Sequence, residues 1–141
     1  PVGRYGKEGA QGTTLDAVCP QCPTGKYSPM EASTQCLDCP PGSQCPDNGM
    51  SKYTPCPIGK YNNIPKQGAC EDCPGGTYSA TLGQAICTGC SAGKYLQGTG
   101  GKSADECIAC KKGKYAPMKG SAECMPCGKD TYGMLNTLFP R

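Results

Sequence analysis

The chain has 141 residues, a formal net charge of +3, and 21 glycines, 14 prolines and 14 cysteines. Valine, isoleucine, leucine and phenylalanine together number only 13, which is too few for an ordinary hydrophobic core. The cysteines instead indicate a chain held by cross-links in an oxidising compartment, so we expect an extracellular or cell-surface location. The charge is mild and no cluster of basic residues is long, which argues against nucleic acid as a partner.

No hydrophobic run approaches the length of a membrane span, and the N-terminus has no signal-peptide profile. We therefore expect no membrane span in this segment. If the protein is secreted, we expect the sequence to be a mature piece or a slice of something longer.

One pattern recurs along the chain: C-x-x-G-K-Y, a spacer, and C-x-x-C, whose last cysteine opens the next unit. The stretch from Cys22 to Cys39 shows it in full, with Gly25, Lys26 and Tyr27 after the opening cysteine. Successive openings lie 17 residues apart, except for one step of 20. The opening cysteines are Cys22, Cys39, Cys56, Cys73, Cys90, Cys110 and Cys127.

This register divides the chain into repeat units. We expect a partial first repeat at 1–21, standard repeats at 22–38, 56–72, 73–89 and 110–126, an atypical repeat at 39–55, a repeat with an insertion at 90–109, and a partial repeat or cap at 127–141.

The first unit already carries the G-[KR]-Y element at Gly3, Arg4 and Tyr5. In later units a cysteine stands three residues before that glycine, so we expect the natural chain to have one immediately before Pro1. The long spacer between Tyr5 and Cys19 is rich in glycine and threonine and is predicted to be a surface loop.

Two later units depart from the pattern. In the 39–55 unit, Tyr53 stands where a cysteine is expected and Cys45 is additional, so we expect this unit to differ in shape, as a bend or joint. In the 90–109 unit, three extra residues are placed within 97–102 as an inserted loop tip. In the tail, a small apolar cluster is expected to cap the array or join it to a neighbour.

No segment has helical periodicity, and each G-K-Y run suits a strand of two or three residues. Each unit is too small to bury a face alone and must lean on its neighbours, as solenoid repeats do. We therefore predict a small disulfide-rich fold: an elongated array of short irregular β-hairpins with little or no helix and no conventional hydrophobic core.

The cysteine spacing predicts one disulfide within each unit. A closed loop of about 15 residues stabilises a fold by roughly 3 kcal/mol, so several in series can replace a core. Connectivity around Cys39, Cys45 and Cys56 stays open. The predicted pairs are Cys22–Cys36, Cys39–Cys45, Cys56–Cys70, Cys73–Cys87, Cys90–Cys107 and Cys110–Cys124.

Two cysteines remain unmatched, Cys19 and Cys127. Cys19 would pair with the expected cysteine before Pro1, and Cys127 with a downstream one. Alternatively, Cys127 of one copy joins Cys19 of the next and forms head-to-tail polymers.

Zinc is the main rival to disulfides, because pairs of C-x-x-C motifs approach the spacing of four-cysteine zinc sites. Histidine is absent and the pattern is continuous rather than grouped in fours, which favours disulfides. Redox catalysis through C-x-x-C needs a βαβ context that the sequence lacks.

The repeat tyrosines and the basic residues before them admit two interpretations each. The rings either cover neighbouring disulfides or form an outward ladder for glycans or subunits. The lysines and Arg4 are either a solvated face, with their stems on the rings, or a stripe for polyanions. The tyrosines are Tyr5, Tyr27, Tyr61, Tyr78, Tyr95, Tyr115 and Tyr132, and the lysines are Lys26, Lys60, Lys94 and Lys114.

Catalytic constellations are missing. Histidine is absent, the 11 carboxylates are scattered in spacers, and no glycine-rich phosphate loop stands between a strand and a helix. We therefore expect no enzyme activity, no cofactor and no catalytic or metal site.

The quoted unit, Cys-Pro-x-Gly-Lys-Tyr to Cys-x-x-Cys-Pro, resembles the ephrin-receptor-like cysteine-rich repeats of receptor ectodomains and protist surface proteins. The short C-x-x-G-K-Y loop is also similar to the first module of tumour-necrosis-factor-receptor cysteine-rich domains. The resemblance implies a repeat fold outside the cell, serving as a rod or platform. No ligand-contact motif of the receptors is present here.

The sequence repeats regularly and has no recognisable catalytic or ligand-contact motif, which favours a structural role. We expect a non-enzymatic segment of an extracellular filament, appendage or surface coat, whose partners are copies of itself or flanking repeats of the same chain, with glycans as a further class. The alternative is a ligand-binding ectodomain of a cell-surface receptor.

Overall fold

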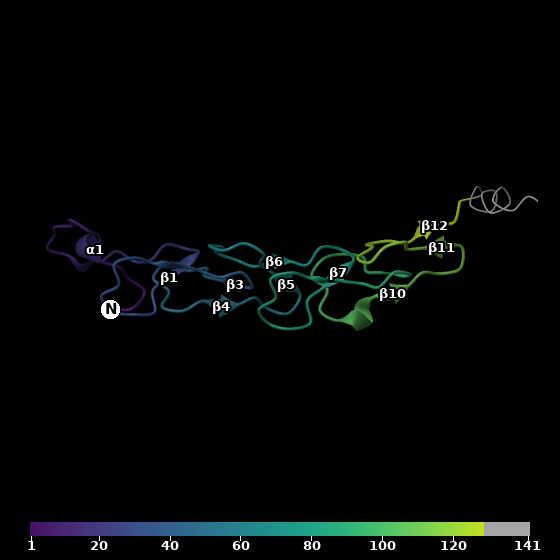
Figure 1. The fold of residues 1–141 in the computed structure, drawn as a ribbon, viewed down its shortest axis with the longest axis horizontal. Coiled ribbons are helices and arrows are strands. Elements are labelled where there is room, and N and C mark those ends of the chain that lie inside the picture. The colour runs from purple at the N-terminus through teal and green to yellow at the C-terminus, as the bar shows by residue number, and fades with distance from the viewer. Residues whose placement is uncertain (129–141) are drawn as a thin grey trace, which may run out of the picture.

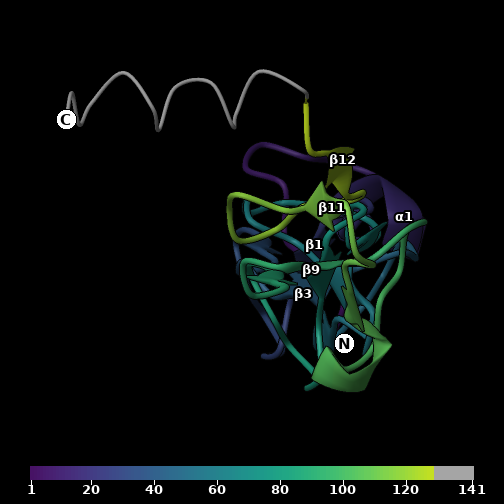
Figure 2. The ribbon, with the colours of Figure 1, turned by 90° about the vertical axis from the view of Figure 1, so that its right-hand side faces the viewer.

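The computed structural model describes residues 1–128 of the chain. They form an elongated array in which short hairpins follow one another from the N-terminus at one end to β12 at the other (Figure 1). Viewed from the end, the strands overlie one another within a narrow cross-section (Figure 2). The predicted disulfide-rich array of β-hairpins is confirmed.

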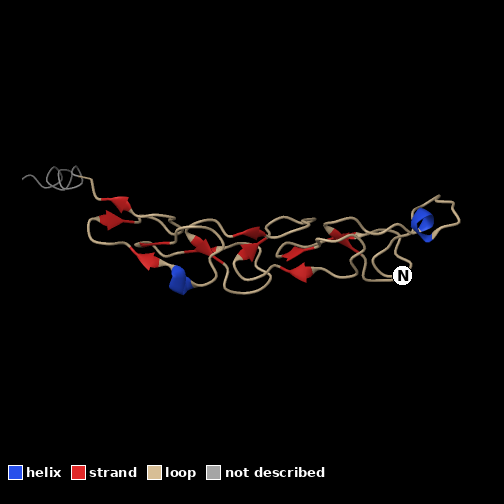
Figure 3. Ribbon diagram, turned by 180° about the vertical axis from the view of Figure 1, so that it is seen from behind, coloured by secondary structure: helices blue, strands red, loops and turns tan. Residues whose placement is uncertain are grey.

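The hairpins are two-stranded antiparallel sheets in which each strand has two residues. Between them run turns and loops, which make up most of the chain (Figure 3). The hairpins are β1 (Lys26–Tyr27) with β2 (Leu37–Asp38), β3 (Ser43–Gln44) with β4 (Thr54–Pro55), β5 (Lys60–Tyr61) with β6 (Glu71–Asp72), β7 (Thr77–Tyr78) with β8 (Thr88–Gly89), β9 (Lys94–Tyr95) with β10 (Ile108–Ala109), and β11 (Lys114–Tyr115) with β12 (Met125–Pro126). In the first unit, Arg4 and Gln21 form the equivalent isolated bridge.

Each hairpin begins with a tight four-residue turn, and the glycine of the repeat is the third residue of that turn. In the 22–38 unit, the Lys26 N–H donates to the Pro23 carbonyl at 3.0 Å, and Gly25 lies between them with a φ of 81°. A positive φ at this place is the requirement of a type II turn, and glycine meets it without steric cost. The Cys39 N–H then donates to the Gly25 carbonyl at 2.9 Å and closes the hairpin onto the next opening cysteine.

The residue that follows the repeat tyrosine, or Gln44 in the atypical unit, is buried in every unit from 22–38 onward. We call this place the post-tyrosine position. It is occupied by small or polar side chains as well as by leucine, so the burial comes from the backbone path and not from hydrophobic character. Its residues and exposed fractions are Ser28 0%, Cys45 0%, Asn62 4%, Ser79 0%, Leu96 8% and Ala116 4%.

Successive units are joined through this position by main-chain hydrogen bonds. The turn glycine of each unit donates its N–H to the carbonyl of the post-tyrosine residue in the following unit. Because a buried backbone group must find a partner, these bonds fix how one unit sits on the next. The pairs and distances are Gly3–Ser28 2.9 Å, Gly25–Cys45 2.8 Å, Gly42–Asn62 2.7 Å, Gly59–Ser79 2.9 Å, Gly76–Leu96 2.7 Å and Gly93–Ala116 2.9 Å.

A second bond uses a loop residue with positive φ, which we call the left-handed loop residue. Its N–H donates to the carbonyl of the opening cysteine in the preceding unit. The carbonyl of the residue after the left-handed loop residue accepts a further bond, from the N–H of the post-tyrosine residue in the preceding unit. An example is the bond from the Ser79 N–H to the Gly101 carbonyl, at 2.9 Å. The left-handed pairs are Gly49–Cys22, Lys66–Cys39, Gly83–Cys56, Gly100–Cys73 and Gly120–Cys90, at 2.7 to 2.9 Å.

Contacts also reach two units ahead. The carbonyl of the left-handed loop residue faces the turn glycine of the unit before the preceding one. A Cβ added at Gly76 would lie 2.1 Å from the Gly120 oxygen, and one added at Gly25 would lie 2.3 Å from the Lys66 oxygen. These turn positions therefore require glycine twice, for the positive φ and for the close approach of another unit.

Cysteine side chains make up most of the buried apolar residues in the array. Among the described residues, the buried apolar side chains are eight cysteines with Leu96 and Ala116. The one cluster of buried apolar residues joins Cys90, Leu96 and Cys107, with Tyr78 of the preceding unit packed against it. This interior agrees with the expectation that no conventional hydrophobic core forms.

The atypical 39–55 unit has the same junctions as its neighbours. Its turn glycine, Gly42, donates to Asn62 of the next unit, and its left-handed residue, Gly49, donates to Cys22 of the previous one. The displaced Cys45 occupies the post-tyrosine position and is fully buried. This unit therefore changes the location of its cysteine without changing the main-chain bonds on either side.

The placement of the three-residue insertion within 97–102 was wrong. Leu96 and Gly100 have the same four-residue separation as Ser79 and Gly83, and Gly100 makes the usual bond to Cys73. The extra residues follow Gly100 and form a 3-10 turn, η1 (Ala104–Glu106). Gly100, which resembles part of a loop tip in the sequence, is thus a junction residue.

The first spacer is also more ordered than a loop. It contains a four-residue helix, α1 (Leu15–Val18), preceded by Thr14 in an extended conformation. The predicted surface loop between Tyr5 and Cys19 thus contains one helical turn, at the N-terminal end of the array (Figure 1).

We predict that Gly76→Ala destabilises the protein more than Gly98→Ala. Both glycines have φ near 85°, but a Cβ at Gly98 would meet nothing within 4 Å. Gly98→Ala should cost about 1–2 kcal/mol from the left-handed backbone alone, whereas Gly76→Ala adds overpacking of about 1–3 kcal/mol. Denaturant unfolding with intact disulfides measures both; equal midpoints would contradict the contact two units ahead.

Candidate functional site

The cysteines form six disulfides in the described residues, each within one repeat unit. The pairs are Cys22–Cys36, Cys39–Cys45, Cys56–Cys70, Cys73–Cys87, Cys90–Cys107 and Cys110–Cys124. The sequence separation is 14 in four of them, 17 across the insertion, and 6 in the atypical unit. The opening cysteine is the more buried partner in four of the units, whereas Cys39 and Cys45 are both fully buried.

The atypical unit, whose bridge is Cys39–Cys45, has an aromatic contact at the place of the usual closing cysteine. Tyr53, at the position of the usual closing cysteine, is 45% exposed. Its ring meets the ring of Tyr27 edge to face, with centroids 5.4 Å apart. This geometry is one that aromatic pairs favour, and it links the loop of one unit to the hairpin of the preceding unit.

Cys19 and Cys127 carry free thiols. Cys19 follows α1 and Cys127 follows β12, so they lie at opposite ends of the described array (Figure 1). A bond between these two residues of one chain is excluded by this separation. Cys127 is exposed and Cys19 is partly buried.

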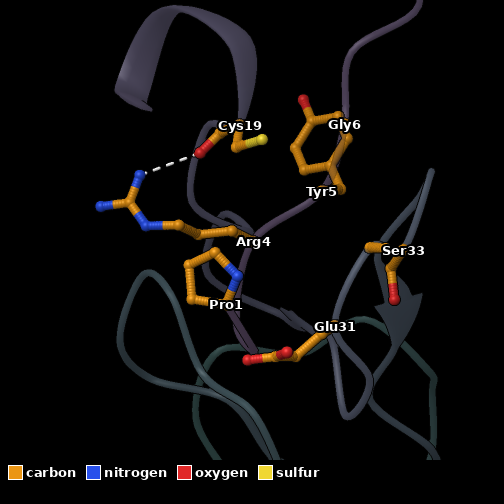
Figure 4. A pocket seen from close by; sticks show the side chains of 8 residues that line it. Pro1, Arg4, Tyr5, Gly6, Cys19, Glu31 and Ser33 are labelled. Carbon is orange, nitrogen blue, oxygen red and sulfur yellow. Dashed lines mark hydrogen bonds between the residues drawn. The ribbon is translucent and has the colours of Figure 1, made fainter. Parts of the chain in front are cut away.

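A hollow of about 290 Å³ lies beside Cys19 and is lined by Arg4, Tyr5 and Glu31 among others. The Arg4 guanidinium donates to the Cys19 carbonyl at 2.9 Å and forms an ion pair with Asp16. In Figure 4 the Glu31 carboxylate lies on the opposite side of the hollow from the Cys19 sulfur.

The lysines of the repeat fall into two groups. Lys26 and Lys60 stand directly across their hairpins from Asp38 and Asp72. The ammonium and carboxylate groups are 2.6 Å apart in the first pair and 2.7 Å in the second. The cross-strand partners of Lys94 and Lys114 are instead Ala109 and Pro126.

Asp38 shows the electrostatic effect of this pairing. The hydrogen bond from Lys26 lowers the pKa of the Asp38 carboxyl below its usual value, with smaller coulombic contributions from Lys26 and Lys66. The group is exposed to solvent, so the ion pair orients the two side chains more than it stabilises the fold.

The repeat tyrosines are neither fully buried nor a fully outward ladder. Five of them, from Tyr5 to Tyr95, are half-buried, and Tyr115 is 42% exposed. Tyr78 packs against the next unit's disulfide cysteines, Cys90 and Cys107. Tyr132, together with the apolar tail, lies outside the described residues.

Residues 1–128 contain no group of three or more histidine, cysteine, aspartate or glutamate side chains that could hold a metal ion. In the same part of the chain, no helix has the length and hydropathy needed to cross a membrane.

The composition and motifs of the sequence do not predict two sets of structural residues, the post-tyrosine residues and the left-handed loop residues. The post-tyrosine residues share no chemistry, so composition did not mark them. The left-handed loop residues are glycine in four units, but Ala32 and Lys66 occupy the place in two others, with φ of 55° and 68°. Their common signal is distance, since each lies four residues after the post-tyrosine position.

Residues 59–107 match the family model described as tyrosine-protein kinase ephrin type A/B receptor-like. The matched stretch runs from the turn glycine of the 56–72 unit to the closing cysteine of the 90–109 unit. A comparison with curated proteins found no match.

We predict that the atypical disulfide can be converted into a standard one by Cys45→Ser with Tyr53→Cys. Serine already occupies the post-tyrosine position at Ser28 and Ser79, and the new thiol stands at the closing position of the other units. The double variant should fold with six disulfides and two free thiols, as counted by alkylation and intact mass. Cys45→Ser alone should leave Cys39 free and lower the melting temperature, because closing even a short loop contributes about 2 kcal/mol.

We predict that the pKa of Asp38 rises towards its ordinary value in Lys26→Gln, because the largest cause of the lowering is the Lys26 hydrogen bond. A pKa depressed in the folded state gives stability that is present above the unfolded value and lost as the pH falls through the folded one. NMR titration of the Asp38 carboxyl carbon measures the change, and Lys94→Gln is the matched control. An unchanged Asp38 titration in Lys26→Gln would contradict the assignment.

Proposed function

Since residues 59–107 are an ephrin-receptor-like cysteine-rich repeat, we propose that the chain is a structural segment of an extracellular filament, appendage or surface coat. It acts without catalysis, as a stiff rod of disulfide-bridged units. Its partners are copies of itself or flanking repeats of the same chain, joined head to tail.

The observation that carries this proposal is the recurrence of the same main-chain bonds at each junction. Turn-glycine donors and left-handed loop donors link neighbouring units from 22–38 to 110–126. The approach of Gly83 to Gly42, or of Gly120 to Gly76, adds contacts two units apart. A unit held by both its neighbour and its second neighbour resists bending more than units linked by single strands of chain would.

The junctions also make the array extendable. Their donors and acceptors belong to the main chain, so they need only the turn glycine and the loop geometry, not particular side chains. On this basis we propose the boundaries 22–38, 39–55, 56–72, 73–89, 90–109 and 110–126 as the structural repeats. Further units of the same pattern can continue the array from either end.

An oxidising environment fits the six disulfides and the receptor-like repeat, which indicate an extracellular or cell-surface location. Cys19 and Cys127, free at opposite ends, are the residues through which successive segments would be joined covalently. Non-covalent stacking of units does not depend on them.

A ligand-binding ectodomain is the second candidate, because the matched family description names a receptor kinase. The two functions differ in what the protein does at high concentration. A rod segment joins other rods, whereas a receptor ectodomain stays discrete and binds one protein ligand to saturation.

Negative-stain electron microscopy of the oxidised protein, isolated with its natural neighbours, tests the proposal. We expect straight rods of uniform width that continue end to end, and a loss of covalent ladders on non-reducing gels in Cys19→Ser with Cys127→Ser. The reduced protein should lose the rod, since cross-links replace the core. Discrete single particles that bind one protein partner stoichiometrically would sink the filament proposal in favour of the receptor.

A further inference from the structure

The lysines of the two C-terminal described units lack the partners that the earlier ones have. Lys26 and Lys60 are neutralised by Asp38 and Asp72 across their hairpins. Within residues 1–128, Lys94 and Lys114 form no ion pair, because alanine and proline stand opposite them. One cross-strand position therefore decides whether the repeat lysine is neutralised or available.

The distribution of charge reinforces this difference. Residues 1–89 carry six basic and seven acidic side chains, whereas residues 90–128 carry six lysines and three carboxylates. The excess lies mostly in the 110–126 unit, which has Lys111, Lys112, Lys114 and Lys119 against Glu123. All four of these lysines are exposed. The positive potential of the described array is thus concentrated at its C-terminal end.

A hollow of about 280 Å³ lies between the 90–109 and 110–126 units at this end. Tyr95 and Gln97 line it from one unit, and Lys111, Lys114 and Glu123 line it from the other. The volume is close to the lower limit of small-molecule sites, so it accommodates one or two sugar rings. β9 and β11 hold Tyr95 and Lys114, so the hairpins position both.

The chemistry of the lining combines two recognition modes. The Lys111 and Lys114 ammonium groups are charge-assisted donors for a carboxylate or a sulfate. The half-buried ring of Tyr95 offers an apolar face with a polar tip, which suits the C–H face of a sugar. The Gln97 amide and the Glu123 carboxylate can hydrogen-bond to hydroxyl groups.

We propose that this hollow binds an acidic sugar of a polysaccharide, whose chain follows the positive C-terminal end of the array. The acid group pairs with Lys111 and Lys114, the ring lies on Tyr95, and a hydroxyl donates to Glu123. The Glu123 carboxylate in the lining repels the closely spaced phosphates of a nucleic acid but accepts hydrogen bonds from sugar hydroxyls. This favours a polysaccharide over a nucleic acid. The segment would thereby attach to an acidic matrix at one end while continuing as a rod.

The experiment measures binding of polysaccharides to the immobilised, oxidised full chain. Polygalacturonate offers carboxylates alone, dextran sulfate offers sulfates alone, and heparin offers both; neutral dextran and inorganic polyphosphate are the controls. We expect at least one acidic polysaccharide to bind and neutral dextran not to bind. The comparison of the first two probes identifies which acid group is recognised, and failure of all three acidic probes overturns the proposal.

Matched double variants locate the site. Lys111→Gln with Lys114→Gln should weaken binding about tenfold, since each exposed charged contact contributes somewhat under 1 kcal/mol. Lys26→Gln with Lys60→Gln removes the same charge from paired lysines and should leave the affinity within about twofold. Equal losses in the two variants would mean that net charge alone attracts the polysaccharide, and would overturn the site.

Tyr95→Gln separates sugar recognition from attraction of anions in general. Glutamine stands at the equivalent place in the atypical unit, as Gln44 in β3, so the hairpin tolerates it. The variant should weaken polysaccharide binding several-fold while leaving any residual polyphosphate binding unchanged, and Tyr61→Gln is its control. If Tyr95→Gln has no effect, or if polyphosphate binds as tightly as the acidic polysaccharides, the assignment of a sugar site is wrong.

Discussion

The fold depends on the close approach of a loop carbonyl to a turn glycine two units away. At Gly76 the Gly120 oxygen occupies space that any Cβ would need, and at Gly42 the Gly83 oxygen does the same. Glycine also permits the positive φ of the turn, which aims the N–H at the next unit. One residue type thus meets three demands, and the geometry of stacking accounts for its presence at Gly3, Gly25, Gly42, Gly59 and Gly76.

Disulfides and main-chain bonds have different tasks in this array. Each disulfide closes a loop within a single unit and acts chiefly by restricting the unfolded chain, and none of the six joins two units. The order between units comes from hydrogen bonds such as Gly59 to Ser79 and Gly83 to Cys56. The residues that accept the turn-glycine bonds lie at the buried post-tyrosine position, and the bond is the same whether that residue is serine, asparagine or leucine. Disulfides therefore stabilise the individual units, and main-chain hydrogen bonds hold successive units together.

Cysteine spacing predicts the hairpins and the class of fold, because a fixed register of C-x-x-G-K-Y and C-x-x-C leaves few ways to close each unit. It does not predict the buried position, where Ser28, Asn62 and Leu96 share no property except place. The insertion was misplaced for a similar reason, since Gly98 and Gly100 resemble a flexible tip when the bond from Gly100 to Cys73 is unknown. The residues that stack are marked by their spacing in the chain and not by residue type, so composition alone does not reveal them.

The variation between units is confined to positions that stacking does not use. The residue opposite the repeat lysine is aspartate in two hairpins but alanine or proline in two others. The 22–38 and 56–72 units, with aspartate, and the 90–109 unit, with alanine, nevertheless make the same bonds to the unit that follows. Because that residue faces solvent at the hairpin edge, its identity changes the surface charge without affecting the rod. A scaffold made by backbone bonds is free to place a charged surface in one unit and a neutral one in the next. The surface charge of such an array is therefore set unit by unit, and Lys94 and Lys114 lack the cross-strand aspartate that Lys26 and Lys60 have.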